Sequence, residues 1–102
     1  MSANRHRGEA SLLVAGEELL LRPTFSALVA AEEELGSLFE LVERAAAGTL
    51  HLQQIVALFD HLSRLRPVAI TRETIGDAIV ELGLTRVSPM LKTVFQQILQ
   101  GR

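Results

Sequence analysis

Alternating apolar and polar positions open the chain and predict a β-hairpin over residues 8–22. We place its two-residue II′ loop at Gly16–Glu17, because this turn takes glycine in its first position. In that register four apolar side chains share one face: Leu12, Val14, Leu19 and Leu21. The opposite face then carries the cross-strand pair of Leu13 and Leu20.

A two-stranded hairpin alone is marginal in water, and both of its edges are open to pairing. We therefore expect one face to pack on helices and the other face, or an edge, to meet another chain. The alternative is that helices of the same chain cover both faces.

From residue 25 onward, apolar residues recur at helical spacing. The predicted helices cover about residues 25–35, 38–47, 52–65, 72–82 and 89–100. Four of these helices begin after a predicted N-cap, and these caps are Thr24, Ser37, Thr71 and Ser88. The predicted fold class is α+β, an N-terminal hairpin followed by a bundle of four to five short helices.

The apolar stripes predict which side of each helix faces the core. The stripe of the first helix contains Phe25, Leu28, Val29 and Leu35, with Glu32 inside it. The helix over 52–65 is apolar on more than one side, so we place it at the centre of the helical part. The last helix has Pro89 at its first position, where proline costs least.

Length and composition limit the possibilities further. A chain of 102 residues has room for one domain, residues 8–102, with a radius of gyration of about 13 Å. Residues 1–7, MSANRHR, predict a flexible basic arm. The sequence contains no cysteine, which excludes disulfides, thiolate metal sites and thiol nucleophiles.

The same composition bears on the compartment. No apolar run reaches the roughly 20 residues that cross a bilayer, and the first residues lack the apolar segment of a secretory signal. We expect a cytoplasmic protein without a membrane partner.

The sequence shows no catalytic or metal-binding pattern. His6, His51 and His61 are too far apart for a local metal motif, and we expect them at the surface or at helix caps. No nucleophile elbow, zinc-protease, P-loop or dinucleotide-binding pattern occurs. We therefore expect no enzyme, no catalytic residues, no metal and no cofactor.

Charge is unevenly distributed. Residues 1–60 hold nine acids and four arginines, a net −5, whereas residues 61–102 hold three acids and six basic residues, a net +3. The run Glu32, Glu33 and Glu34 stands at a predicted helix C-terminus, where the macrodipole disfavours anions. A basic partner or a metal would compensate this placement; the alternative is a solvated helix face.

Residues 74–95 have the outline of a helix-turn-helix, with a small residue, a glycine turn and a second helix. Ala78 and Gly83 are five residues apart rather than four, and only Arg86 and Lys92 offer positive charge. Two packed helices with a glycine cap explain the segment better, so we expect no nucleic-acid partner. A DNA-binding regulator remains one alternative function.

The opening stretch also resembles a known family. The similarity lies in Arg7-Gly8-Glu9 before a short hairpin and in the run from Thr24 to Leu28 that leads to Glu32 and Gly36. In these residues the chain is similar to the gene-transfer-agent family of small phage-tail proteins, which is grouped with tail assembly chaperones. Ile75-Gly76, Gly83 and a proline-started last helix extend the resemblance over most of the chain. Three positions differ from the usual family pattern: Ser26, Ala31 and Thr74.

The resemblance implies a non-enzymatic tail assembly chaperone that binds the tape-measure protein or the tail tube protein in the bacterial cytoplasm. A structural tail component that stays in the particle is the alternative. The predicted partner-binding residues are Leu13, Leu20, Glu32, Glu33 and Glu34, and self-association through the hairpin is a further possibility.

Overall fold

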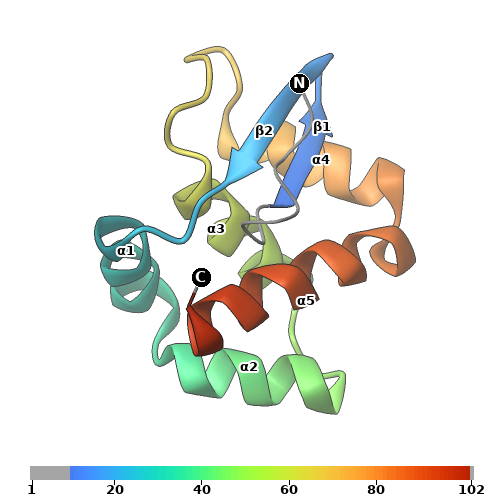
Figure 1. The fold of residues 1–102 in the computed structure, drawn as a ribbon. Coiled ribbons are helices and arrows are strands. Elements are labelled where there is room, and N and C mark those ends of the chain that lie inside the picture. Colours follow the sequence, from blue (N-terminus) through green and yellow to red (C-terminus); the bar gives the residue numbers. More distant parts are fainter. Residues whose placement is uncertain (1–9, 102) are drawn as a thin grey trace.

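A two-stranded antiparallel hairpin packs on five helices (Figure 1), which confirms the predicted α+β class. The computed structural model describes residues 10–101, so the predicted basic arm lies outside the described residues. The strands are β1 (Ala10–Val14) and β2 (Glu17–Leu21). The helices are α1 (Phe25–Leu35), α2 (Leu38–Ala47), α3 (Leu52–Leu62), α4 (Arg72–Leu82) and α5 (Leu84–Gln100). The radius of gyration is 12.5 Å.

The predicted hairpin register is wrong by two residues. Leu12 pairs with Leu19, and Ala10 pairs with Leu21. The loop is Ala15–Gly16, and both of its residues have positive φ, 50° and 81°, as a type I′ turn requires. Leu13 therefore lies opposite Glu18 and not opposite Leu20.

The faces of the hairpin are nevertheless those predicted. Side chains alternate with a period of two, so a shift of two residues leaves every side chain on its original face. The inner face is buried in the core: Leu12, Val14, Leu19 and Leu21. This face lies against the helices, since β1 contacts α4 and α5 and β2 contacts α3.

Three of the helices begin after the predicted caps. The hydroxyls of Thr24, Ser37 and Thr71 accept hydrogen bonds from the third backbone N–H of α1, α2 and α4, at 3.2, 3.4 and 3.3 Å. Such caps satisfy N–H groups that have no partner inside the helix. The observed bounds of these three helices coincide with the predicted ranges.

The predicted buried stripe of α1 is confirmed for Leu28 and Leu35, which are partly buried against the core, and is wrong for Phe25 and Val29. Phe25 is 86% exposed and Val29 is exposed as well, whereas Ala27 and Ala31 are buried. Small alanine side chains let α1 approach α3 closely, and the larger residues of the predicted stripe are left at its border. Hydrophobicity alone favoured Phe25, but the close contact selects the alanines.

The last helix begins five residues earlier than predicted. Gly83 alone joins α4 to α5, and the helix continues from Leu84 through Pro89. Ser88 is not a cap, because its hydroxyl donates to the carbonyl of Leu84 at 2.8 Å. The early start buries Val87 in the core, which accounts for the extra turn.

Helix α3 lies at the centre, in contact with α1, α4 and β2, as predicted. It ends at Leu62 rather than at residue 65. Its C-terminal half is buried on all sides, and the buried residues include the polar side chains of Asp60 and His61. The predicted surface position of His61 is therefore wrong.

A buried ionic network and a candidate docking surface

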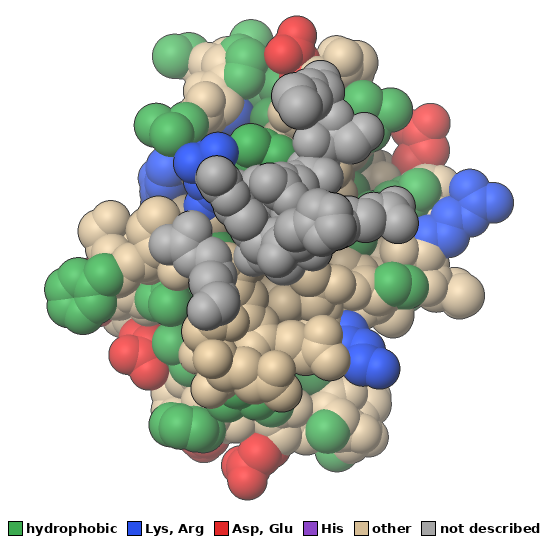
Figure 2. Space-filling model, in the orientation of Figure 1, with side chains coloured by type: hydrophobic (Ala, Val, Ile, Leu, Met, Phe, Trp, Pro, Cys, Tyr) green, Lys and Arg blue, Asp and Glu red, His purple; other side chains and the backbone are tan. Residues whose placement is uncertain are grey.

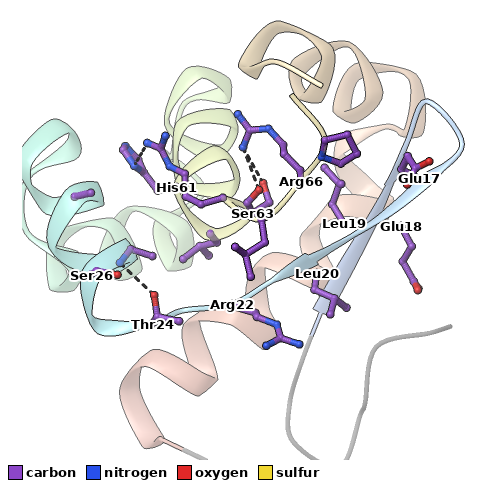
Figure 3. A pocket seen from close by; sticks show the side chains of 16 residues that line it. Glu17, Glu18, Leu19, Leu20, Arg22, Thr24, Ser26, His61, Ser63 and Arg66 are labelled. Carbon is purple, nitrogen blue, oxygen red and sulfur yellow. Dashed lines mark hydrogen bonds between the residues drawn. The ribbon is translucent and has the colours of Figure 1, made fainter. Parts of the chain in front are cut away.

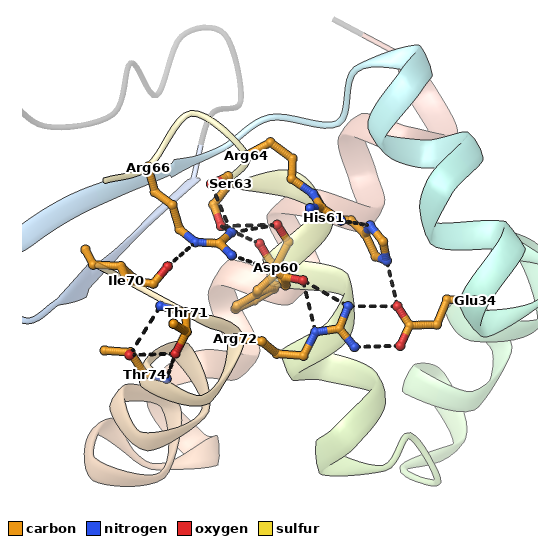
Figure 4. A network of polar contacts seen from close by, with 11 residues as sticks. Glu34, Asp60, His61, Ser63, Arg64, Arg66, Ile70, Thr71, Arg72 and Thr74 are labelled. Atoms are coloured by element: carbon orange, nitrogen blue, oxygen red, sulfur yellow. Dashed lines mark hydrogen bonds and ion pairs between the residues drawn. The ribbon is translucent and has the colours of Figure 1, made fainter. Parts of the chain in front are cut away.

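The segment between α3 and α4, residues 63–71 (the 63–71 loop), is held by one internal arginine (Figure 4). The guanidinium of Arg66 donates to the carbonyls of Ile70, Asp60 and Ser63 at 2.6, 3.1 and 3.2 Å, and it forms an ion pair with the Asp60 carboxylate. The Ser63 hydroxyl donates to the Phe59 carbonyl at 2.7 Å. A loop whose carbonyls converge on one planar cation has little conformational freedom left.

A second arginine joins the loop region to α1. Arg72, the first residue of α4, donates through Nε to Asp60 Oδ2 at 2.9 Å. Its two terminal nitrogens lie 2.6 and 2.8 Å from the two carboxylate oxygens of Glu34, a bidentate contact between residues 38 positions apart. Four segments thus meet at this network: the end of α1, the end of α3, the loop and the start of α4.

His61 completes the network from its buried position in α3. Its Nδ1 accepts from the Arg64 guanidinium at 2.9 Å, because an arginine can only donate. The ring proton therefore sits on Nε2, which donates to Glu34 Oε1 at 2.7 Å. Glu34 accordingly accepts hydrogen bonds from two different side chains.

These contacts shift the pKa values of the carboxyl groups. Hydrogen bonds from Arg72 and His61 lower the pKa of Glu34 to about 2. Burial raises the pKa of Asp60, but the hydrogen bonds and charges of Arg72 and Arg66 outweigh it and the net pKa is lowered. The two carboxylates raise the pKa of the Arg72 guanidinium above its already high value. Glu34, Asp60 and Arg72 are therefore charged at neutral pH, so the network is an ionic clamp.

The pinned loop presents apolar side chains to solvent. Leu65 is 93% exposed and Val68 is 97% exposed, and the neighbouring Arg64 is also exposed, with its guanidinium against His61. Exposed leucine and valine on an ordered loop gain nothing in the folded monomer. The arrangement is typical of a surface that contacts another molecule.

A first groove lies beside this loop (Figure 3), between β2, the start of α1 and the end of α3, and we name it the β2–α1 groove. Its apolar lining includes Leu20, Ala27, Ala30, Leu62 and Leu65. The outer edge of β2 meets α3 at one end of this groove, where the Arg22 N–H donates to the Leu62 carbonyl at 2.8 Å.

A second groove, the α3–α4 groove, lies on the other side of the ionic network. Apolar residues line it from three helices: Leu35, Leu52, Val56, Ala57 and Val80. Gly76 also lines this groove, and the Val56 side chain packs beside it, 3.6 Å from where a Cβ at this position would lie. Glu73 and Asp77 border the groove, and with Glu81 they form an exposed acidic row at four-residue spacing on α4.

Other exposed apolar side chains are distributed over several elements, and Phe25 and Val29 lie one turn apart on α1. Figure 2 shows hydrophobic side chains at several separate places on one face, between acidic and basic ones. The two grooves are therefore the more specific candidates for contact with a partner.

The predicted partner-binding residues are dispersed over the structure. Leu13 is 69% exposed on the outer face of the hairpin, while Leu20 is half-buried in the β2–α1 groove. Glu32 accepts the N–H of Leu38 at 3.1 Å and thus caps α2, and Glu33 is exposed. Glu34 has the basic partner that its helix-terminal position called for, and that partner is Arg72 of the same chain.

Sequence reasoning missed Asp60, Arg66 and Arg72 as a group. A signal was present, because Asp60 and His61 interrupt the otherwise apolar stretch from Ile55 to Leu62. A charged residue at such a position needs a cation nearby, and arginines follow six and twelve residues later.

No group of three or more acidic or histidine side chains over residues 10–101 is arranged to hold a metal ion. Over the same residues, no helix combines the length and apolarity that crossing a bilayer requires.

The comparisons with known proteins gave one match. A family model described as "Phage tail tube protein, GTA-gp10" matches residues 7–101, almost the whole chain. Neither the curated proteins nor the solved structures contain a match. The description agrees with the expected class of phage and gene-transfer-agent tail proteins. It names a tail tube protein, so it does not support the expected role as a tail assembly chaperone.

Proposed function

Because the chain belongs to the family of phage tail tube proteins described as GTA-gp10, we propose that it is a structural component retained in the tail of a phage or gene-transfer-agent particle. The family match over residues 7–101 carries this proposal. The role is non-enzymatic and rests on contacts with other tail proteins, formed as the particle assembles in the bacterial cytoplasm.

The chemistry of the network supports a structural role. A general base needs a carboxylate whose pKa lies near neutrality, but that of Glu34 is about 2 and that of Asp60 is also lowered. Both carboxylates are bound to arginines of the same chain. They hold α1, α3 and α4 in a fixed arrangement and thereby shape the two grooves.

The geometry of residues 74–95 gives no support to DNA binding. A helix-turn-helix joins its helices through a turn of three to four residues, whereas Gly83 alone joins α4 to α5. The exposed side of α4 carries Glu73, Asp77 and Glu81, which would repel phosphates.

Mass spectrometry of purified particles tests the proposal. A structural component is expected at a constant ratio to the other tail proteins in every preparation. A chaperone that binds the tape-measure protein only during assembly would be present in the producing cells and absent from the particles. That second result would overturn the proposal.

A gel shift with nonspecific duplex DNA at low salt tests the remaining alternative. We expect the full chain to give no shifted band. A shifted band that weakens as the salt concentration rises would instead indicate a DNA-binding protein.

A further inference from the structure

We propose that the chain binds a second copy of itself, with the 63–71 loop of one copy seated in the α3–α4 groove of the other. This inference rests on the proposed function, of which it names one partner. It differs from the expected self-association through the hairpin, because neither surface includes β1 or β2.

The loop is prepared for such a contact. Arg66 fixes its backbone through three carbonyls and the Asp60 carboxylate, so little entropy is lost when the loop binds. Leu65 and Val68 are almost fully exposed on it. Burial of two such side chains supplies favourable free energy without any rearrangement of the monomer.

The groove offers a surface of matching chemistry. Leu52, Val56 and Val80 give it apolar walls, and Gly76, which has no side chain of its own, forms part of the lining beside Val56. It is lined by three helices that the ionic network holds together. A preformed apolar groove of this kind accepts a protruding apolar side chain.

Charge fixes the orientation of the contact. Arg64 stands beside Leu65, and its guanidinium meets no carboxylate among residues 10–101. Glu73 and Asp77 border the groove, and no ion pair involves them within the same described residues. A positive loop next to an acidic groove attracts the loop of another copy, whereas loop against loop or groove against groove would bring like charges together.

The loop and the groove are different surfaces, so each copy contributes one of each. Two copies that exchange their loops reciprocally form a closed dimer, and copies related by another rotation form a ring or a filament. In either case, every loop has a groove as its partner.

Sedimentation velocity of the purified full chain tests the proposal, over concentrations from about 1 μM to about 500 μM. Two variants each destroy one surface. The loop variant is Leu65→Ser with Val68→Ser, and the groove variant is Asp77→Lys with Val80→Lys. All four side chains are exposed, so the fold is retained, which circular dichroism and thermal unfolding verify.

We expect the wild type to associate and each variant to show a dissociation constant at least about tenfold higher. An equimolar mixture of the two variants should recover association, because it still pairs one intact loop with one intact groove. The matched control is Leu13→Ser, an exposed leucine on the hairpin that should leave association unchanged. Raising the salt from about 50 mM to about 500 mM should weaken the wild-type complex, since the charges lie at the rim.

Three results would overturn the proposal: a wild type that stays monomeric throughout, a mixture that does not recover association, or a loss of association caused by Leu13→Ser. The outcome is independent of the particle experiment. A monomeric chain found in purified tails would leave the structural role intact, and a self-associating chain absent from tails would refute that role alone.

Discussion

At the scale of single residues, Glu34 shows how the environment of one carboxylate sets the response of the fold to acid. Its pKa is lowered from 4.5 to about 2 by Arg72 and His61. A lowered pKa in the folded state means that the charged form stabilises the fold, fully above about pH 4.5 and progressively less as the pH falls towards 2. The side chain is 40% exposed, so solvent screening reduces this contribution to about 1 kcal/mol.

We therefore expect Glu34→Gln to lower the free energy of unfolding at pH 7 by about 1 kcal/mol. The variant should also lose less stability than the wild type when the pH drops from about 4.5 to about 2. Urea unfolding at a series of pH values measures both effects. Glu33→Gln, one residue earlier and exposed, is the control and should follow the wild-type curve.

Among residues 10–101, Ala15 is the one non-glycine residue with a positive φ. It adopts φ of 50° in the hairpin turn, a region that asparagine tolerates better than alanine. Ala15→Asn should raise the free energy of unfolding by about 0.5 kcal/mol, while Ala15→Val should lower it, because a β-branched side chain disfavours positive φ. Equal stabilities of the two variants in urea unfolding would contradict the turn assignment.

At the scale of elements, the sequence predicts most of the fold because periodicity and capping are local properties. Thr24, Ser37 and Thr71 reveal helix starts without any knowledge of the neighbours. The hairpin register is different, since the two candidate registers differ by two residues and bury the same four side chains. The alternation of apolar and polar side chains therefore does not distinguish the two registers, and the position of the turn at Ala15–Gly16 determines which one forms.

The candidate site was less predictable for a related reason. The contact of Glu34 with Arg72 joins positions 38 residues apart, and Leu65 was assigned to a helix that in fact ends at Leu62. Long-range ion pairs have no sequence period. An apolar residue on a loop also looks the same in sequence as one in a core.

Helix α4 provides a test at the element scale. Gly76 lies in its interior, and a Cβ there would meet the Val56 side chain at 3.6 Å, an ordinary contact distance. Gly76→Ala should therefore raise the free energy of unfolding by about 0.5–1 kcal/mol, because alanine loses less backbone entropy in a helix.

Gly83→Ala is the matched comparison. Gly83 has φ of 94°, so alanine should be destabilising there by about 1 kcal/mol, although nothing lies within 4 Å of the added Cβ. Thermal unfolding of both variants measures the difference. A Gly76→Ala variant that is less stable than the wild type would show that α4 is not helical around this residue.

At the scale of the whole molecule, the ionic network connects helix ends that are far apart in the sequence. Arg72 belongs to α4 but holds the last turn of α1 through Glu34, and it shares Asp60 with the 63–71 loop through Arg66. The apolar contacts between α1 and α3 and between α3 and α4 would persist without it. The network therefore affects the free energy of local unfolding at the end of α1 and the start of α4 more than it determines the fold itself.

Arg72→Leu separates these two effects. It removes the cation from Glu34 and one of two cations from Asp60, which should lower the free energy of unfolding by about 2 kcal/mol. In native-state hydrogen exchange, the last turn of α1 and the first turn of α4 should both exchange at least about tenfold faster, with a smaller change in α5. Arg86→Leu, at an exposed position on α5, is the control and should change neither turn. Faster exchange restricted to α4 would mean that the Glu34 contact does not hold α1 in solution, and the α3–α4 groove would then lose one of its walls.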